Sequence, residues 1–137
     1  LGYAQHATAA LTHYSYNASQ TYKAGEDFLF AYGKEYGVKT YIYRFSNLFG
    51  KWGNPNYNSV VTTFCYNISR NLDITISNPD VLLTLMYIDD VVREIYNAIL
   101  GNPNILDDGF CSVEISHNIT LGDLAKMIYK FKLFIFQ

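Results

Sequence analysis

Charged side chains are scarce in this chain of 137 residues, which contains 16% Asp, Glu, Lys and Arg and has a formal net charge of −2. No block of basic residues occurs anywhere in the sequence. Nucleic acids and anionic membranes attract proteins through clustered Lys and Arg. We therefore expect neither a nucleic acid nor a membrane to be a partner of this chain.

Residues that bind metals or form disulfides are also few. There are two cysteines, Cys65 in a helical pattern and Cys111 in a strand-like one, and no C-x-x-C motif. We predict that both are reduced core residues, and a disulfide or metal role is the less favoured alternative. His6, His13 and His117 are scattered, without a carboxylate at ligand spacing, so no metal site is predicted.

Long apolar runs are missing too, since no stretch reaches the ~18 residues of a membrane span. No charged segment followed by an apolar core indicates a signal peptide, so the expected compartment is the cytoplasm. The chain starts with Leu1 and ends with the apolar run KFKLFIFQ, residues 130–137, which has β character. An exposed run of that kind favours edge pairing, so we expect a fragment of a longer protein.

Half of the residues are apolar, so the chain can bury a core, and its length fits one domain. Helical and strand-like patterns alternate, which predicts an α/β fold. Helices are expected at 20–36, with Gly37 as the stop, and from Asn58 or Ser59 as N-cap. Further helices are expected from Asp89 or Asp90 as N-cap to Leu100, and from Thr120 onward, where Thr120 and Asp123 resemble a capping box. Strands are expected at 38–45, 73–76, 81–87 and 110–115.

Apolar residues at helical spacing predict which face of each helix is buried. In the first helix a single stripe contains Phe28, Leu29, Tyr32 and Tyr36. The next two helices are expected to bury Val60, Val61, Phe64, Cys65 and Ile68, and then Val91, Val92, Ile95 and Ile99. The last helix is expected to bury Leu121, Leu124, Met127, Ile128 and Phe131.

The segment 38–45 is β-branched and aromatic on both faces, which is typical of a strand in a parallel sheet. In open α/β sheets, ligands bind beyond the carboxyl ends of such strands. The loop 46–58 follows this strand and is rich in asparagine, whose amide both donates and accepts hydrogen bonds. The residues suited to a polyhydroxylated ligand are Asn47, Asn54, Asn56 and Asn58.

The same loop contains glycines and aromatic residues. Gly50 and Gly53 allow close approach of the backbone, while Trp52 and Tyr57 offer flat faces that can cover a sugar or a base. The alternative is an ordinary turn of Asn, Gly and Pro with aromatic packing, and composition by itself favours that alternative.

Three motifs favour a ligand-binding loop over an ordinary turn. They are R-F-S-N-L-F-G at 44–50, P-N-Y-N-S-V at 55–60 and M-Y-I-D-D-V-V at 86–92. Together they resemble the extended short-chain dehydrogenase/reductase family, also called the NAD-dependent epimerase/dehydratase family. The nearer resemblance is to the UDP-sugar reductases of capsular polysaccharide biosynthesis. The resemblance covers roughly residues 17–131 and is most specific from about 35 to 100.

The resemblance implies a fold and an activity. The fold would be the C-terminal part of a Rossmann-like doubly wound domain plus the smaller substrate-binding lobe, so that residues 1–137 form a partial domain. The activity of the parent would be reduction of a UDP-linked 4-keto-6-deoxy N-acetylamino sugar with NADP, or NAD, as cofactor. Helices of this family often pair subunits, so a homodimer is also implied.

Two parts of the parent proteins have no counterpart in this sequence. One is the glycine-rich turn G-x-x-G-x-x-G, which lets a helix N-terminus approach the pyrophosphate of the cofactor. The other is a C-terminal cupin domain that binds a metal. We therefore expect this chain alone neither to bind NADP or NAD nor to act as a reductase.

Site residues follow from the resemblance one at a time. Asn47 stands where the family contacts the nucleotide-sugar, and Asn56 and Asn58 stand where the substrate loop enters its helix. Arg44 is expected to support the loop. Leu83 stands where many sugar-nucleotide epimerases carry an Arg that grips the pyrophosphate, a departure that agrees with the capsular branch.

The family's chemistry uses a Tyr-x-x-x-Lys pair, in which Tyr donates a proton while Lys lowers the Tyr pKa and holds the nicotinamide ribose. Asn17 and Lys23 have the family's spacing, so Lys23 is the predicted catalytic and cofactor-binding lysine. Ser19 occupies the usual Tyr position, although Ser is a much weaker acid. The alternative for Lys23 is a solvated lysine at the start of a helix.

Two other interpretations remain open at this point. The first is a non-catalytic nucleotide-sugar binding or interaction module, which is favoured by Ser19 together with the intact loop 46–58. The second is a decayed reading frame, which is favoured by the weak patterning of the first residues and by the terminal apolar run.

Overall fold

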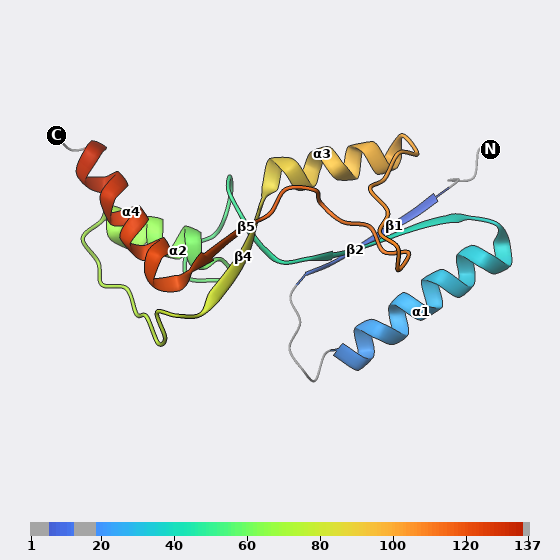
Figure 1. The fold of residues 1–137 in the computed structure, drawn as a ribbon, viewed down its shortest axis with the longest axis horizontal. Coiled ribbons are helices and arrows are strands. Elements are labelled where there is room, and N and C mark those ends of the chain that lie inside the picture. Colours follow the sequence, from blue (N-terminus) through green and yellow to red (C-terminus); the bar gives the residue numbers. More distant parts are fainter. Residues whose placement is uncertain (1–5, 13–18, 136–137) are drawn as a thin grey trace. The chain divides into compact units, whose positions relative to one another are not determined.

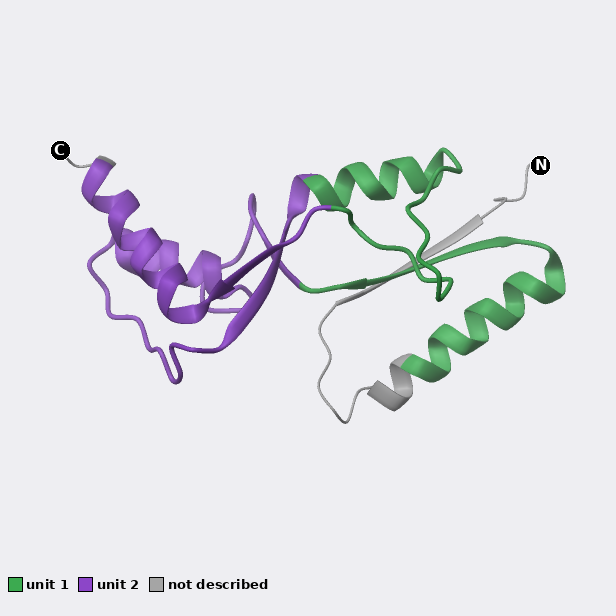
Figure 2. Cartoon of the chain, viewed as in Figure 1, with its two compact units in different colours: residues 1–46, 90–114 green, residues 47–89, 115–137 purple. Residues whose placement is uncertain are grey.

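A computed structural model of the chain describes residues 6–12 and 19–135 (Figure 1). The chain forms two compact units, which are coloured separately in Figure 2. Unit 1 consists of residues 1–46 and 90–114, and unit 2 consists of residues 47–89 and 115–137. Each unit is therefore built from segments that lie far apart in the sequence.

Unit 1 contains a parallel pair of strands. Strand β1 (His6–Thr12) is followed by helix α1 (Ser19–Tyr36) and then strand β2 (Lys39–Phe45). The two strands pair in parallel from His6 opposite Lys39 to Thr12 opposite Phe45. On the other edge of β2, Cys111 forms an isolated parallel bridge with Tyr43.

Strand β2 is covered on both faces, as the sequence predicts. Tyr43 hydrogen-bonds Glu94 of helix α3 (Ile88–Ile99), whereas Arg44 hydrogen-bonds Glu26 of α1. Because successive side chains of a strand point to opposite faces, α1 and α3 lie on opposite sides of β2. Figure 1 shows this arrangement, which is typical of a doubly wound α/β fold.

Unit 2 has a mixed sheet in the order β3-β4-β5. Strand β3 (Asn47–Phe49) pairs in parallel with β4 (Leu82–Tyr87), which pairs antiparallel with β5 (His117–Thr120). Helices α2 (Val60–Ser69) and α4 (Leu121–Ile135) pack against each other. The buried core of this unit is formed by Phe64, Ile68, Leu85, Leu124, Ala125 and Ile128.

Several helix boundaries follow the predicted local signals. Gly37 has a φ of +65°, the left-handed conformation that ends α1. The Ser59 hydroxyl accepts a hydrogen bond from the backbone N–H of Thr62, which makes Ser59 the N-cap of α2. The Thr120 hydroxyl accepts from the backbone N–H of Asp123 in the same way at the start of α4.

The predicted cap of α3 is wrong. The helix begins at Ile88, directly after β4, so Asp89 and Asp90 lie within its first turn. No residue separates the strand from the helix, which leaves no room for a cap at either aspartate. Carboxylates in a first turn still interact favourably with the helix dipole.

Two predicted strands do not form. Residues 73–76 lie in an irregular segment, and Ile74 and Ile76 pack partly buried against the core of unit 2. Residues 110–115 make ladder contacts only at Cys111. In both segments the β-forming residues are present, but a strand also needs a partner along its length.

The predicted buried faces of the helices are partly wrong. The predicted stripe of α1 is largely exposed, and so are some residues that were expected to lie inward on α2, α3 and α4. These exposed residues are Phe28, Tyr32, Tyr36, Cys65, Val92, Ile99, Met127 and Phe131. On α1, Glu26 and Gly33 face β2 instead: Glu26 bonds Arg44, and a Cβ on Gly33 would lie 2.2 Å from Thr40 Oγ1.

The terminal apolar run is helical as far as Ile135, so the interpretation of it as a β-like segment is wrong. Lys132 explains part of this, because its ammonium donates to the backbone oxygen of Ile68 and to the side chain of Asn71. These bonds tie α4 to the C-terminal end of α2. Gln137 lies outside the described residues, and no helix in the described ranges is long and apolar enough to cross a membrane.

Candidate functional site

The asparagine-rich loop of unit 2 begins with a short strand. Asn47 is the first residue of β3 and is partly buried, and its Nδ2 donates to the backbone oxygen of Thr84 in β4 at 3.2 Å. Within the described ranges no donor reaches the Oδ1 of Asn47. The sheet therefore fixes this amide and leaves its oxygen able to accept a hydrogen bond from a ligand.

The first half of the loop packs against the junction of β4 and α3. Gly50 has a φ of +131°, and a Cβ there would lie 2.7 Å from the Ile88 side chain and 2.8 Å from the Tyr87 ring. The Lys51 ammonium lies 2.7 Å from Asp89 Oδ2. This hydrogen bond, more than any other effect, raises the pKa of Lys51 above its ordinary value. Only a residue without a side chain fits at position 50.

The second half of the loop packs against α2. A Cβ on Gly53 would lie 2.3 Å from Thr62 Oγ1, and the backbone N–H of Asn56 donates to Thr63 Oγ1 at 2.9 Å. Asn56 has a φ of +57°, a conformation that Asn tolerates better than most residues. The loop is thus anchored at both ends.

The side chains between and beyond these anchors are exposed. Asn54, Asn56 and Asn58 present their amides at the surface, Trp52 is 97% exposed and Tyr57 is 76% exposed. These are the residue types that bind the hydroxyl groups and flat faces of sugars and bases. The three asparagines and Trp52 thus lie exposed on one short, anchored loop.

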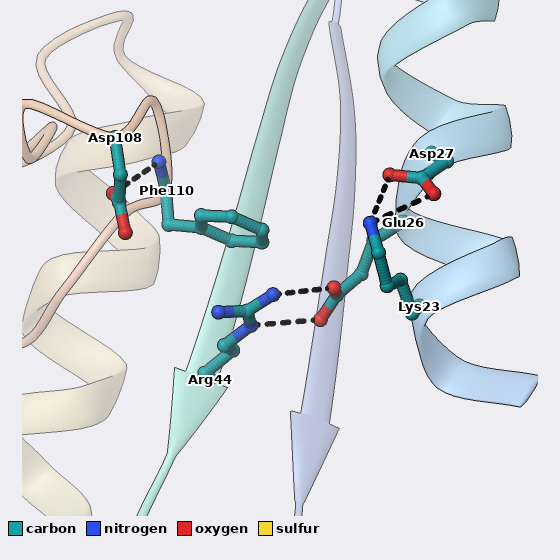
Figure 3. Close-up of polar contacts among 6 residues, drawn as sticks. All are labelled: Lys23, Glu26, Asp27, Arg44, Asp108 and Phe110. Carbon is teal, nitrogen blue, oxygen red and sulfur yellow. Dashed lines mark hydrogen bonds and ion pairs between the residues drawn. The ribbon is translucent and has the colours of Figure 1, made fainter. Parts of the chain in front are cut away.

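Lys23 lies in the first half of α1, four residues after Ser19, with which the helix begins. Its ammonium is exposed and lies 3.0 Å from Asp27 Oδ2, as Figure 3 shows. An exposed pair of this kind contributes little stability, so Lys23 can exchange Asp27 for another anionic or hydroxyl partner. Asn17 and His13 lie outside the described residues.

Glu26, one helical turn beyond Lys23, forms a buried ion pair that the sequence did not reveal. It is 1% exposed and accepts hydrogen bonds from Arg44 Nε at 2.9 Å and Nη2 at 2.6 Å (Figure 3). The guanidinium of Arg44 also lies 3.7 Å from the centre of the Phe110 ring. Arg44 therefore ties β2 to α1, and its support of the loop stays a prediction.

A second buried carboxylate lies on the opposite face of β2. Glu94 Oε1 accepts from the Tyr43 hydroxyl at 2.8 Å and from the backbone N–H of Asn104 at 2.7 Å. Burial, and then the hydrogen bond to Glu94, raise the pKa of Tyr43 well above its usual range. Cys111 is a free, buried cysteine whose pKa is raised mainly by burial, which makes it unreactive.

Cys65 is also a free cysteine, but it is exposed, so its predicted place in the core is wrong. No group of three His, Cys, Asp or Glu that could hold a metal ion occurs among the residues the structure describes. Leu83 is partly buried in β4 opposite Ile119 and packs against the core of unit 2. An apolar residue thus fills the position at which related epimerases are expected to carry a phosphate-binding Arg.

Gly33 of α1 and Gly37 directly after the helix do not form a cradle for a dinucleotide. Gly33 faces Thr40 of β2 and Gly37 ends the helix, so both serve packing and chain reversal. Lys23 fits a contact with a ribose hydroxyl group, but the described residues offer no matching glycine turn for a pyrophosphate. Of the residues that the structure describes, Lys23 alone therefore suits a contact with NAD or NADP.

Comparisons with known proteins agree with this geometry. The NAD dependent epimerase/dehydratase family matches residues 4–106. A UDP-2-acetamido-2,6-beta-L-arabino-hexul-4-ose reductase of Pseudomonas aeruginosa is 42% identical over 110 residues, which cover 80% of this chain and 29% of that protein. The chain thus spans about a third or less of the length of this relative.

Solved structures extend the likeness to the fold. The capsular polysaccharide assembling protein CapF of Staphylococcus aureus is similar with a TM-score of 0.80 and 44% identity over 91% of this chain and 36% of that one. A UDP-glucose 4-epimerase of Thermotoga maritima has a TM-score of 0.68 and 23% identity over 80% of this chain and 35% of that one, which supports the fold alone.

The predicted fold class is confirmed, because the α/β arrangement is that of a portion of a Rossmann-like epimerase or dehydratase. The family match covers most of the chain, including the loop and the start of α3. This chain therefore belongs to the NAD-dependent epimerase/dehydratase family.

Proposed function

We propose that this chain is the substrate-side part of a nucleotide-sugar reductase of capsular polysaccharide biosynthesis. The parent reaction is the NADPH-dependent reduction of a UDP-linked 4-keto-6-deoxy N-acetylamino sugar. In this proposal residues 1–137 form a partial domain, with unit 1 as Rossmann-like part and unit 2 as substrate lobe. The observation that carries the proposal is the anchored loop of unit 2, which exposes three amides and follows the fixed amide of Asn47 along the chain.

Each asparagine has a distinct role in this proposal. Asn47 accepts a hydrogen bond from the ligand through Oδ1, since its Nδ2 is held by Thr84. Asn56 and Asn58 are exposed and can both donate to and accept from hydroxyl, acetamide or imide groups. A ligand with many hydroxyl and amide groups satisfies all three side chains, which is why a nucleotide-sugar fits better than a simple phosphate.

The residues of unit 1 have a smaller part in this proposal. Lys23 is the lysine that would hold the nicotinamide ribose and favour ionisation of a proton donor, and bound NADPH would supply the hydride. Ser19 stands at the position of that donor and is a weaker acid than Tyr. We therefore expect this chain alone to bind a nucleotide-sugar without reducing it. Location in the cytoplasm and a homodimeric parent belong to the same proposal, and the free cysteines suit a reducing compartment.

Titration calorimetry tests the binding part. The purified chain is expected to bind UDP-N-acetylglucosamine, and Asn47→Ala should weaken binding about fivefold to tenfold, because one hydrogen bond is lost. Asn102→Ala, at an exposed asparagine of unit 1, is the matched control and should leave the affinity unchanged. If the chain shows no affinity for UDP-N-acetylglucosamine, or if both variants behave alike, the substrate assignment is wrong.

A kinetic assay tests the catalytic part. NADPH absorbance should stay constant when the chain is mixed with NADPH and a UDP-linked keto-sugar. Turnover of NADPH would contradict the expectation that the chain is inactive by itself. The result of this assay does not depend on the calorimetric one, because binding of the sugar needs only the loop of unit 2.

A further inference from the structure

Trp52 stands out on the anchored loop. It is the single tryptophan of the chain, and its side chain is 97% exposed. Tryptophan side chains are on average highly buried in proteins, because leaving a large apolar ring in water is unfavourable. Its exposure is therefore a feature that the stability of the loop does not explain.

The backbone of Trp52 is unusual as well, with a φ of +65°. Left-handed conformations are unfavourable for bulky residues, whereas glycine and asparagine adopt them readily. Within the described ranges the other residues with positive φ are Asn56, Asn71 and four glycines, so Trp52 is the bulky exception.

The residues on either side hold Trp52 in this conformation. On one side Gly50 packs against Tyr87 and Ile88, and Lys51 pairs with Asp89. On the other side Gly53 packs against Thr62 so closely that no Cβ fits. Contacts on both sides of Trp52 thus hold the backbone of the loop in place, while its ring lies exposed.

An unfavourable conformation that the surroundings impose on an exposed aromatic ring points to a functional use. We propose that Trp52 is a ring-stacking residue that covers a flat face of the nucleotide-sugar, either the uracil base or the apolar face of the sugar. The inference rests on the proposed function and adds a specific residue and contact to it. Stacking on an aromatic side chain is favourable for any flat ring, so it complements the amides of Asn56 and Asn58, which read the polar edges.

Tyr57 is the other exposed aromatic residue of the loop, but the observations favour Trp52. Tyr57 has no positive φ, and its ring is smaller and less exposed than that of Trp52. Nothing in the backbone at Tyr57 indicates that its exposure is imposed by the surrounding contacts.

Fluorescence tests the inference directly, because every tryptophan signal of the chain comes from Trp52. The chain is titrated with UMP, UDP and UDP-N-acetylglucosamine while calorimetry records binding of each. If uracil stacks on the ring, UMP and UDP will quench the emission. If the sugar covers the ring, only UDP-N-acetylglucosamine will change it, with a shift to shorter wavelength. Either result supports the stacking role and identifies the ring.

Variants give a second readout. Trp52→Ala should weaken binding of UDP-N-acetylglucosamine about tenfold, and Trp52→Phe should weaken it less because a ring remains. The side chain is almost fully exposed, so neither change removes packing, and an unchanged thermal melt is the check on folding. Tyr96→Ala on α3, also at an exposed aromatic residue, is the matched control and should bind as the wild type does.

The outcomes separate the two proposals. If calorimetry shows binding of UDP-N-acetylglucosamine while the emission stays constant and Trp52→Ala binds normally, the stacking role is wrong and the proposed function stands. If the wild-type chain binds none of the three nucleotides, the proposed function fails, and the stacking role fails with it.

Discussion

The two units hold their helices in different ways. In unit 1 the helices on both faces of β2 are attached through buried carboxylates: Glu26 of α1 bonds Arg44, and Glu94 of α3 bonds Tyr43. In unit 2 the helices are held by an apolar cluster around Phe64. Among the described residues, the buried carboxylates lie in unit 1 alone.

This difference has consequences for each unit. Hydrogen bonds to a buried carboxylate are directional, so they fix the rotation of α1 even though the aromatic residues Phe28 and Tyr36 then remain exposed. The apolar cluster of unit 2 needs no polar partner, and the side chains of Asn56 and Asn58 lie exposed outside it. Unit 1 thus holds its helices through buried polar pairs, whereas unit 2 holds its helices through apolar packing.

The largest effect is expected from Phe64→Ala in the apolar cluster. Phe64 of α2 is buried in the apolar cluster of unit 2, so truncation should lower the free energy of unfolding by about 3–5 kcal/mol. Hydrogen exchange should accelerate first at the amides of β4 and α4. Equal acceleration in β2 and α1 would show that the two units unfold together. The two units would then not be stabilised independently of each other.

The next effect is expected from Arg44→Met, which removes the two hydrogen bonds that Arg44 donates to the buried Glu26. The loss should be about 2–4 kcal/mol, somewhat below that of a fully buried pair because the Arg44 side chain is 44% exposed. Urea unfolding followed by circular dichroism measures it.

Two further variants test whether this loss of stability comes from the buried charge of Glu26. Asp27→Asn breaks the exposed pair with Lys23 on the same helix and should have no measurable effect on stability. Glu26→Leu combined with Arg44→Met should recover part of the loss, because no charge then remains buried. If Arg44→Met has no larger effect than Asp27→Asn, the view that unit 1 depends on buried polar pairs is wrong.

The smallest effect is expected from Tyr43→Phe, which removes one of two donors to Glu94. The loss at neutral pH should be about 1–2 kcal/mol. The raised pKa of Tyr43 adds a pH dependence. Below the ordinary value of 10.0 both folded and unfolded states carry the proton, so the contribution is fully present. As the pH rises past that value the unfolded state loses its proton first, and stability falls.

Urea unfolding at a series of alkaline pH values measures this effect. The wild type should lose stability more steeply above about pH 10 than Tyr43→Phe does. Tyr57→Phe, at an exposed tyrosine of unit 2, should follow the wild-type curve. Parallel curves for the wild type and Tyr43→Phe would mean that Tyr43 is not held neutral by its burial and by Glu94.

Much of the fold was predictable because the signals for it are local. The helix that ends at Gly37, the strand 38–45 and the cap at Ser59 were all identified from neighbouring residues. The candidate site was predicted in the same way, as a cluster of asparagines in one loop. Whether these asparagines bind a ligand stays a prediction, as do the roles of Lys23 and Ser19.

Other features escaped prediction because they depend on residues far apart in the sequence. The residues near Glu26 in the sequence do not indicate that it is buried, because its partner Arg44 is 18 residues away. The ion pair of Lys51 could not be predicted, because its partner Asp89 lies 38 residues further along the chain. The segment 73–76 has the composition of a strand, yet no neighbouring strand pairs with it.

The sequence by itself determined the family, the α/β alternation, most boundaries of helices and strands, and the composition of the asparagine-rich loop. All of these depend on residue type and on spacing within a few residues. Only the tertiary structure decided which face of each helix is buried, which charges pair, and that Trp52 is held exposed between two anchors. The physical reason is that burial and charge pairing depend on contacts that form only after distant segments have packed together.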